Sequence, residues 1–389
     1  MQSDNCGPDR PAHPGIFPTR EAGKSDHEPA ERSVDFPVSV VLPAGGTGER
    51  TGLQTPKQFC SFLGRPLISY TVQTFERLSW IQSIVVVVAK EHMDLMTDII
   101  QRFQHRKVRV VPGGSTRHRS IWNGVLALGG EAEGEAAAGD RPKVVIIHDA
   151  VRPFVEEDFL YKITMAAKEQ GCTESDFEFG TECLHLALQY CGTNAKLIQG
   201  PPTLWKVTYK RDLAAAESII KDALSQSACI ITGGSAHAAT LAGALQKAAG
   251  ALDTELEVIP DLMGENASYL LKEWNFIRVS VNCSCLSEVE ALLGDLEAAD
   301  RALLHPVVVI WVHLSCSGES SISGGKVEPD VLMELASAAK LQNILLYGIQ
   351  LQQSKEIERW ERSVLKVMEI TSALIRERSP ALVGQLLQA

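Results

Sequence analysis

From Val38 onward, short runs of β-branched and other apolar residues alternate with longer segments in which apolar positions recur every three or four residues. The short runs have the length and composition of buried strands, and the longer segments have the periodicity of amphipathic helices. In the first half of the chain the pattern predicts strands at Val38–Leu42, Ile84–Ala89, Val108–Val111 and Val144–Ile147, and helices at Leu67–Arg77, Met93–Phe103, Arg119–Leu128 and Leu160–Gln170. This alternation is typical of a parallel sheet covered by helices on both faces.

The alternation fails near the middle of the chain. A second helical segment, Phe179–Tyr190, follows the helix Leu160–Gln170 almost directly, with no strand between them. A strand at Ala195–Ile198 and a helix at Lys210–Lys221 then complete the first α/β unit. Because such folds are built from strand–helix repeats, a strand is missing from the pattern at this point.

Strands and helices alternate again in the rest of the chain. The pattern predicts strands at Ala228–Thr232, Glu255–Ile259, Phe276–Asn282, Val307–Leu314 and Ile344–Gln350, and helices at Ala236–Ala251, Ala267–Trp274, Ser287–Leu304, Asp330–Leu341 and Lys355–Arg378. A chain of 389 residues exceeds the size at which one core usually keeps growing, so we expect two α/β domains. The expected organisation is a disordered leader at residues 1–37, a first domain at 38–221 and a second at 228–389, joined near Asp222–Ser227.

Charge and composition narrow the classes of partner. The 37 basic and 48 acidic residues give a formal net charge of −11, which disfavours wholesale binding to nucleic acid or to anionic membranes. The longest apolar runs, Ile84–Ala89 and Val307–Val312, are far too short to span a bilayer. The nine cysteines show no repeated paired spacing, and residues 1–37 contain no apolar stretch of the kind found in signal peptides. These features predict a reduced, cytosolic protein.

A glycine-rich loop follows the first predicted strand. Its sequence is Pro43-Ala44-Gly45-Gly46-Thr47-Gly48-Glu49-Arg50, in which three glycines allow backbone N–H groups to approach an anion closely. The loop has neither the Gly-x4-Gly-Lys-Ser/Thr of a P-loop nor the third glycine of a dinucleotide-binding fingerprint. A plain tight turn is the alternative interpretation. Arg50 and Lys57, however, place two positive charges beside the loop, which favours a site for phosphate groups.

A second polar segment, His148-Asp149-Ala150-Val151-Arg152-Pro153, follows the predicted strand Val144–Ile147. Ligands of open α/β sheets bind at the carboxyl ends of the strands, where this segment begins. The Asp149 carboxylate is suited to hold Mg²⁺, a hard cation that keeps substrate phosphates and waters in its coordination shell. The alternative is that Asp149 caps the next helix, and we expect His148 to pack structurally rather than to react.

Several segments taken together resemble the cytidylyltransferases of the methylerythritol-phosphate type. They are Leu42-Pro43-Ala44-Gly45-Gly46-x-Gly48-x-Arg50, Pro56-Lys57-Gln58-Phe59, Gly113-Gly114-Ser115-x-Arg117-x-x-Ser120, His148-Asp149-Ala150-x-Arg152-Pro153 and the downstream Trp205-Lys206-Val207-Thr208. The resemblance implies a nucleotide-diphospho-sugar-transferase-like sheet domain that transfers CMP from CTP to a polyol phosphate. The acceptor it implies is D-ribitol 5-phosphate, giving pyrophosphate and CDP-ribitol for the O-mannosyl glycan of dystroglycan, with methylerythritol phosphate as the alternative acceptor.

The family resemblance also implies roles for individual residues. Arg50 and Lys57 would neutralise charge that develops on the α-phosphate, and Lys206 would position the acceptor phosphate. Arg152 and Thr181 would help to hold the acceptor. The expected nucleotide-binding residues are Pro43, Ala44, Gly45, Gly46, Gly48, Gly113, Gly114 and Ser120, and the expected Mg²⁺ ligand is Asp149.

The chain departs from this family between Gly171 and Ser175, where the strand pattern fails. At this point the family has a central strand, a projecting β-arm that pairs two subunits, an acceptor-contacting arginine and a Thr-Pro-Gln segment. Because the motifs on both sides are intact, we infer an internally deleted form. The family implies a homodimer, although the arm that pairs the subunits is missing here. A catalytically inactive nucleotide-binding or regulatory form is the alternative to an enzyme.

In the second domain, the loop Thr232–His237 joins a predicted strand to a predicted helix, as a dinucleotide site would. The loop lacks the spaced third glycine, and no acidic residue closes the next strand in a ribose-binding position. We therefore expect a degenerate Rossmann-like fold without cofactor that supports or dimerises the first domain. A nicotinamide-dependent oxidoreductase is the competing interpretation of this domain.

Overall fold

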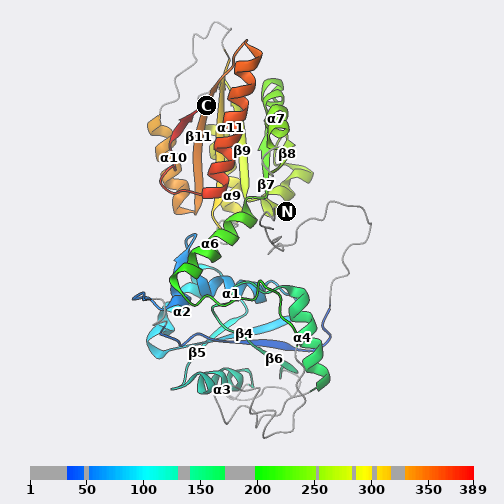
Figure 1. The fold of residues 1–389 in the computed structure, drawn as a ribbon, viewed down its shortest axis with the longest axis vertical. Helices are drawn as coiled ribbons and strands as arrows, with labels where there is room; N and C mark the ends of the chain where they lie inside the picture. Colours follow the sequence, from blue (N-terminus) through cyan, green and yellow to red (C-terminus); the bar gives the residue numbers. More distant parts are fainter. Residues whose placement is uncertain are drawn as a thin grey trace, which may run out of the picture. The chain divides into compact units, whose positions relative to one another are not determined.

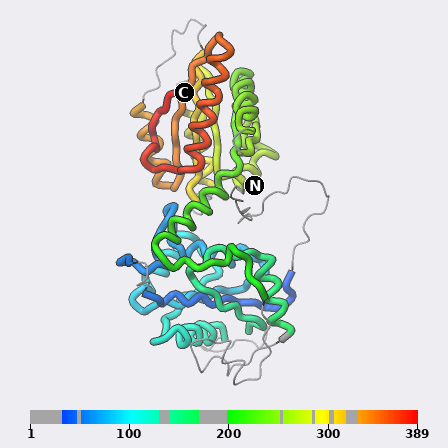
Figure 2. Tube along the Cα trace, in the orientation of Figure 1, coloured from blue at the N-terminus to red at the C-terminus, as the bar shows by residue number. Residues whose placement is uncertain are grey.

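The computed structural model describes residues 33–47, 52–129, 141–170, 198–250, 254–282, 286–299, 305–316 and 329–389. The chain divides into two compact units, residues 1–60 with 66–213 and residues 61–65 with 214–389. The division falls inside helix α6 (Lys210–Leu224), whose carboxyl end reaches the junction predicted at Asp222–Ser227. Figure 2 follows the chain through the first unit, from blue to green, and through the second, from green to red.

The first unit is built around a parallel four-stranded sheet with the order β5-β4-β1-β6. Its strands are β1 (Val38–Pro43), β4 (Ile81–Val88), β5 (Val108–Pro112) and β6 (Val144–Ile147), and its helices are α1 (Leu67–Glu76), α2 (Met93–Arg102), α3 (Arg117–Leu128) and α4 (Glu157–Gln170). Single 3-10 turns form at Lys57–Phe59 and Lys90–His92, and β2 (Ser61–Phe62) pairs with β3 (Arg65–Pro66). The predicted segments Phe179–Tyr190 and Ala195–Ile198 lie outside the described residues except for Ile198, which is not in a strand.

Helices cover both faces of this sheet (Figure 1). Successive residues of a strand point to opposite faces, so Val40 and Leu42 pack in the core formed with α1, α2 and α4, whereas Val41 packs with residues of α3. Gly124 brings α3 directly onto the sheet, because a Cβ at this position would lie 2.5 Å from Val41 Cγ1. The sheet is therefore buried on both sides, as its continuous apolar strands predict.

Two boundaries in the first unit differ from the predicted ones. Val34 and Phe36 pack against the first core, so the unit includes residues that were expected in the leader. Val34 and Phe36 alternate with Asp35 and Pro37 ahead of Val38, a period of two that the predicted strand start at Val38 leaves out. Helix α3 begins at Arg117 rather than Arg119, because the Thr116 side chain caps it by accepting a hydrogen bond from Arg119 N–H at 3.2 Å.

The second unit contains a six-stranded sheet with the order β12-β11-β10-β9-β7-β8, in which the paired strands are parallel. Its strands are β7 (Ser227–Ile231), β8 (Glu255–Ile259), β9 (Asn275–Val281), β10 (Val307–Ser315), β11 (Ile344–Gln352) and β12 (Leu386–Gln388). Its helices are α7 (Ala236–Ala249), α8 (Tyr269–Lys272), α9 (Ser287–Ala298), α10 (Pro329–Leu341) and α11 (Ile357–Glu377), and a 3-10 turn, Gly264–Ser268, precedes α8. Counted within the unit, the strand order is 2-1-3-4-5-6, which is the flavodoxin-like doubly wound order 2-1-3-4-5 with a sixth strand added and differs from the dinucleotide-binding Rossmann order 3-2-1-4-5-6.

A buried arginine, Arg378, links three separate segments of the second unit through hydrogen bonds. The Arg378 guanidinium donates to the carbonyl oxygens of Pro306 at 2.6 Å and Leu224 at 3.0 Å, and to Asn275 Oδ1 at 2.7 Å. Burial lowers the pKa of Arg378 to about 10, so the side chain stays charged at neutral pH. Leu224 is the last residue of α6, so this cation complements the negative end of that helix's dipole.

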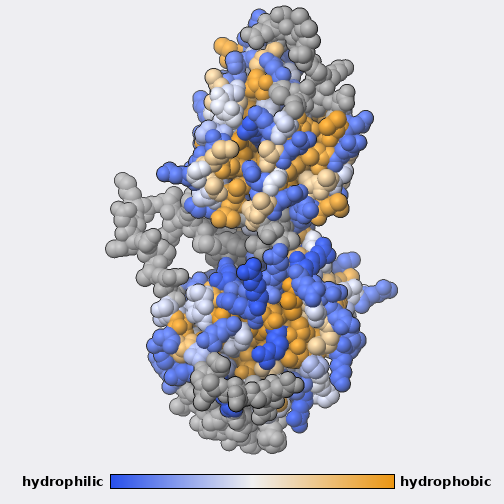
Figure 3. Space-filling view, turned by 180° about the vertical axis from the view of Figure 1, so that it is seen from behind, coloured by the Kyte–Doolittle hydropathy of each residue, from blue (hydrophilic) through white to orange (hydrophobic). Residues whose placement is uncertain are grey.

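The molecular surface mixes hydrophilic and hydrophobic side chains in both units (Figure 3). Large apolar side chains that remain exposed include Met263, Leu271, Leu341 and Ile357, all in the second unit. In the described part of the chain, no helix combines the length and the apolar character needed to cross a membrane.

Candidate active site

The glycine-rich loop leaves the sheet of the first unit at the carboxyl end of β1. The Ala44 N–H donates to Val87 O at 2.7 Å, so the loop stays attached to β4 for one residue beyond the strand. The side-chain amide of Gln58 donates to two loop carbonyls, Ala44 O at 2.7 Å and Gly46 O at 2.9 Å. A buried side chain therefore binds the loop through its backbone.

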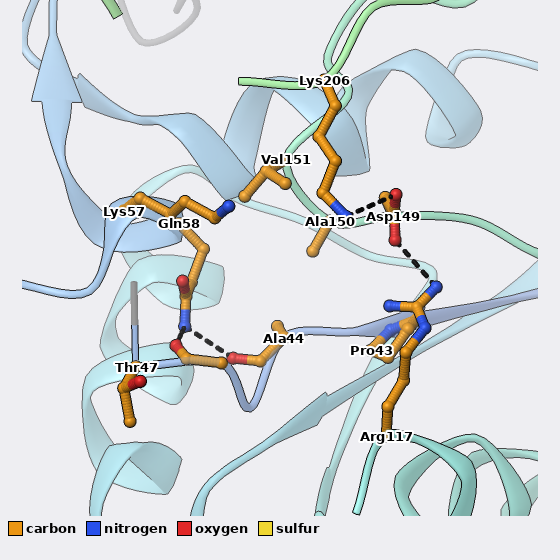
Figure 4. A pocket seen from close by; sticks show the side chains of 11 residues that line it. Pro43, Ala44, Thr47, Lys57, Gln58, Arg117, Asp149, Ala150, Val151 and Lys206 are labelled. Carbon is orange, nitrogen blue, oxygen red and sulfur yellow. Dashed lines mark hydrogen bonds and ion pairs between the residues drawn. The ribbon is translucent and has the colours of Figure 1, made fainter. Parts of the chain in front are cut away.

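A cavity of about 480 Å³ opens beside this loop, a size suited to a small-molecule substrate. Five parts of the first unit form its walls: the loop, the 3-10 turn that follows it, the start of α3, the segment after β6 and the segment before α6. The lining residues are Pro43, Ala44, Gly46, Thr47, Lys57, Gln58, Arg117, Asp149, Ala150, Val151 and Lys206. Figure 4 shows Asp149 between Lys206 and Arg117, with Lys57 directed toward Val151 from the other side.

Asp149 is the centre of a cluster of positive charges. Its Oδ1 lies 2.8 Å from Arg117 Nη2, and its Oδ2 lies 3.0 Å from Lys206 Nζ and 3.1 Å from Arg152 Nε. The Asp149 side chain is 12% exposed, whereas the three cationic side chains are 32 to 50% exposed. One largely buried carboxylate is thus surrounded by three cations that keep contact with solvent.

These cations determine the protonation state of Asp149. Burial by itself raises the pKa of this carboxyl group, but the hydrogen bond from Lys206, the charge of Arg117 and the hydrogen bond from Arg152 outweigh it. The pKa of Asp149 is therefore held far below its ordinary value, and the group is ionised at every physiological pH. An ionised carboxylate is the form that can hold cations or a metal ion.

The strand β6 brings Asp149 to the cavity, and His148 fixes the turn that follows it. The His148 N–H donates to Val41 O at 3.0 Å, and His148 Nε2 donates to Arg152 O at 2.9 Å. Burial lowers the pKa of His148, and its ring packs edge-on against Phe75. The neutral imidazole therefore holds the turn in shape, in agreement with the structural role that the sequence predicts.

Lys206 is positioned by the same turn. The Val207 N–H donates to Val151 O at 3.0 Å, and Arg152 Nη1 donates to Leu204 O at 2.6 Å. Just beyond, Asp212 Oδ2 accepts from the two backbone N–H groups that precede α6, at 2.8 Å each, as in one half of a capping box. Lys206 therefore lies in a segment that hydrogen bonds hold in place on both sides of it.

Gly113, Gly114 and Ser120 support the start of α3 rather than lining the cavity. The Gly114 N–H donates to Ser120 Oγ at 3.1 Å, and a Cβ at Gly114 would lie 2.5 Å from Arg119 Cβ. The glycines are required because the turn folds back closely on the helix. Arg117, the first residue of α3, reaches the cavity from this turn.

The structure brings together part of the predicted site. Lys57, Lys206, Asp149, Pro43, Ala44 and Gly46 line one cavity, and Arg152 joins them through its ion pair with Asp149. Gly45 lies within the loop but is not a lining residue, and Gly113, Gly114 and Ser120 form the neighbouring turn. Arg50, Gly48 and Thr181 lie outside the described residues.

Two contributors were not assigned a role from the sequence. Arg117 and Gln58 stand inside the segments that carry the family resemblance, but neither was singled out. Arg117 follows Thr116, a typical helix-capping residue, and this signal places it at a helix start that faces the ligand end of the sheet. Gln58 adjoins the predicted Lys57, but no sequence pattern shows that its amide contacts the loop.

The comparisons with known proteins match both halves of the chain. Residues 38–175 match the family model for 2-C-methyl-D-erythritol 4-phosphate cytidylyltransferase, and residues 226–368 match the model for the C-terminal domain of D-ribitol-5-phosphate cytidylyltransferase. Together with the parallel sheet, the glycine-rich loop and the clustered cations, these matches define a cytidylyltransferase, a class of nucleotidyltransferase.

Full-length relatives identify the family within this class. The D-ribitol-5-phosphate cytidylyltransferase of Xenopus tropicalis is 41% identical over 406 residues, covering 90% of this chain and 97% of the relative. The mouse protein of the same name is 39% identical over 456 residues, covering all of both chains. The chain belongs to the D-ribitol-5-phosphate cytidylyltransferase family. A solved 4-diphosphocytidyl-2C-methyl-D-erythritol synthase from Anaerococcus prevotii aligns with a TM-score of 0.37 at 18% identity, covering 47% of this chain and 96% of that one.

The chain has fewer residues than its alignment with a relative has positions, which concerns the predicted deletion. The alignment with the mouse relative has 456 positions and includes this entire 389-residue chain, so at about 67 positions the relative has a residue and this chain has none. The match to the first family model ends at residue 175, the last residue of the interval Gly171–Ser175 where we expect the deletion. That interval lies outside the described residues.

Proposed function

We propose that this chain transfers a cytidylyl group from CTP to D-ribitol 5-phosphate. A phosphate oxygen of the acceptor attacks the α-phosphorus of CTP and forms a new P–O bond. The bond between the α-phosphorus and the oxygen that bridges to the β-phosphate breaks, and pyrophosphate leaves. The products are CDP-ribitol and pyrophosphate, the reaction in the name of the relatives with which the chain aligns from end to end.

The convergence of Lys57, Arg117 and Lys206 on one cavity supports this proposal. Both substrates are anionic, so their phosphate groups repel each other until cations neutralise them. Arg117 offers a planar fork for two phosphate oxygens, whereas the lysines act as point charges. We propose that Lys57 and Arg117 bind the triphosphate and that Lys206 brings the acceptor phosphate toward the α-phosphate, with Arg152 behind it.

The donor set also fits a magnesium ion, but only together with a nucleotide. Within the described residues no group of three or more His, Cys, Asp and Glu side chains comes together, which disfavours a metal cage made of protein alone. Mg²⁺ commonly takes one carboxylate and completes its shell with substrate phosphates and water. We propose that Asp149 holds Mg²⁺ in this way, and the bound ion would neutralise phosphate charge. Arg117 and Lys206 would then transfer from the Asp149 carboxylate to the phosphate oxygens.

The direct test is pyrophosphate release by the whole chain with CTP, Mg²⁺ and D-ribitol 5-phosphate. Release that depends on the acceptor supports the proposal, and no release above the rate without acceptor would remove it. Methylerythritol phosphate, UTP and GTP are run in parallel, because they test the choice of acceptor and of base. A variant with Lys57 replaced by Met provides the inactive control, since it removes a cation that lines the cavity.

A catalytically inactive nucleotide-binding form is the second candidate. The observation that favours it is the set of about 67 aligned positions that the chain lacks relative to the mouse protein. The CTP-binding residues proposed above are all present, so such a form would retain CTP affinity. Binding of CTP without acceptor-dependent pyrophosphate release would identify it.

We further propose that the protein acts in the cytosol, where CDP-ribitol would supply ribitol phosphate for the O-mannosyl glycan of dystroglycan. We also propose a homodimer, as the family resemblance implies, with the second unit contributing to its interface. Light scattering of the purified chain tests the dimer, since a monomeric mass at assay concentration would exclude it. Fractionation of cells that express the chain tests its location.

A further inference from the structure

The amide of Gln58 makes a contact that the proposed chemistry does not use. Its Nε2 donates one hydrogen to Ala44 O at 2.7 Å and the other to Gly46 O at 2.9 Å. Gln58 is only 2% exposed, and its bond to Ala44 O forms away from competing water, whereas the bond to Gly46 O reaches an exposed residue of the loop. Both donors of one buried amide are thus committed to the backbone of the glycine-rich loop (Figure 4).

This contact constrains the direction of the loop's peptide groups. Each peptide unit is planar, so its carbonyl and the N–H of the next residue point in opposite directions. With the carbonyls of Ala44 and Gly46 turned toward Gln58, the N–H groups of Gly45 and Thr47 are turned away from it. Because glycine imposes little preference of its own, the loop depends on an outside contact to hold one conformation.

The support for Gln58 is itself firmly anchored. Gln58 lies in the 3-10 turn Lys57–Phe59, which is closed by hydrogen bonds from Phe59 N–H to Pro56 O at 2.9 Å and from Cys60 N–H to Lys57 O at 3.2 Å. The Phe59 side chain is buried in the core of the first unit. The same turn carries Lys57 into the cavity, so Gln58 links this cation and the loop into one rigid element.

We propose that Gln58 is a positioning residue that presets the glycine-rich loop for the triphosphate of the nucleotide. This inference rests on the proposed function, because it takes the loop as the phosphate site. Gln58 acts through the loop backbone and does not touch the reacting atoms. Its loss weakens binding of CTP, whereas binding of the acceptor is unchanged.

Two substitutions separate hydrogen bonding from the filling of space. Gln58→Met keeps the length and most of the volume but removes both donors. Gln58→Glu keeps the shape and places carboxylate oxygens against two carbonyl oxygens. The matched controls are Gln246→Met and Gln246→Glu, because Gln246 Nε2 also donates to a backbone carbonyl, Leu256 O at 2.7 Å, but lies in the second unit.

The readouts are the dissociation constant of CTP, the KM values of both substrates, kcat, and hydrogen exchange of a peptide containing residues 44–47 in the ligand-free protein. Loss of two neutral hydrogen bonds is expected to raise the CTP dissociation constant about 10- to 100-fold in Gln58→Met, and more in Gln58→Glu. The KM of CTP rises with it, the KM of the acceptor stays unchanged, and exchange of the loop peptide becomes faster. The Gln246 variants behave like the wild type in all four measurements.

A merely structural role gives a different result, with kcat reduced by loss of folded protein and both KM values unchanged. That result, or a CTP dissociation constant within twofold of wild type in both Gln58 variants, overturns the inference. The wild-type protein separates this failure from failure of the proposed function. CTP binding without turnover removes the proposed function, while the comparison of CTP affinities still decides the role of Gln58. Absence of CTP binding by the wild type overturns both.

Discussion

Replacing Asp149 by Asn tests how much the ion pairs around Asp149 contribute to stability and how they affect substrate binding. The substitution keeps the shape of the side chain and removes the negative charge that Arg117, Arg152 and Lys206 share. Breaking a fully buried pair costs roughly 3–5 kcal/mol and breaking an exposed one about 1 kcal/mol or less. Because Asp149 is 12% exposed but its partners are 32 to 50% exposed, we expect a loss of about 2 kcal/mol.

The same substitution is expected to strengthen the binding of an anion in the absence of metal. In the wild type the Asp149 carboxylate competes with pyrophosphate for Arg117 and Lys206, and Asp149→Asn removes this competitor. Weakening two charge-assisted bonds of this kind corresponds to about a tenfold change in affinity. Turnover of CTP moves in the opposite direction and falls on the order of 100-fold, because the proposed metal ligand is lost.

The pH dependence of stability follows from the lowered pKa of Asp149. A lowered folded-state pKa contributes stability that is present above the unfolded pKa, about 3.9 for Asp, and is lost as the pH falls through the folded value. Both values lie below pH 5, so the difference between wild type and Asp149→Asn should be constant from pH 5 to 8.

Denaturant unfolding at several pH values and titration with pyrophosphate in EDTA measure these quantities. The matched control is Asp35→Asn, since Asp35 pairs with Lys168 at 3.1 Å but is 81% exposed, and we expect little change there. An Asp149→Asn variant as stable as wild type that binds pyrophosphate no more tightly would refute the account of the cluster.

Three further predictions concern other contacts. Lys57→Met should lower kcat/KM for CTP about 100-fold, because it removes a cation from the cavity. Lys221→Met, which removes a half-buried lysine of α6 that pairs with Glu217 and does not line the cavity, should leave kcat/KM unchanged, and equal kinetics of the two variants would contradict this. Gly114→Ala should cost about 1–3 kcal/mol in unfolding experiments and raise the KM of CTP, because its Cβ would lie 2.5 Å from Arg119 Cβ. Arg378→Met should destabilise the second unit by about 3 kcal/mol, since three acceptors lose their donor, and an unchanged unfolding transition would exclude this.

The hydrophobic pattern predicts most of the fold because strands buried on both faces read as continuous apolar runs. The strands β1, β4 and β6 are found within a few residues of their predicted bounds. The pattern does not predict β12, Leu386–Gln388, because three residues are too few to show a period and their pairing with β11 is a tertiary contact. It also misses the 3-10 turn Lys57–Phe59, which is fixed by burial of Phe59.

Residues of the candidate site could be predicted where the signal comes from their neighbours in the sequence. They could not be predicted where it comes from contacts between segments far apart in the chain. Asp149 is predicted because it follows a buried strand, and Lys57 because it lies close to a glycine-rich loop, and both line the cavity. The ion pair of Arg117 with Asp149 joins residues 32 positions apart in the chain, and no pattern in either segment predicts it. The contact of Gln58 with the loop carbonyls is likewise set by the fold of the whole unit.

The contacts around Asp149 assemble the cavity from segments that lie on both sides of the interval Gly171–Ser175. All lining residues except Lys206 precede the interval Gly171–Ser175, and Lys206 follows it. The segment that carries Lys206 is bonded directly to the earlier part of the chain, through Val207 N–H to Val151 O and Arg152 Nη1 to Leu204 O. These bonds join the two sides of the interval directly, so Lys206 lies with the other cations of the cavity through contacts between described residues. If the deletion proposed for this interval removes the family's acceptor-contacting arginine, affinity for the polyol phosphate is the property that it should weaken first.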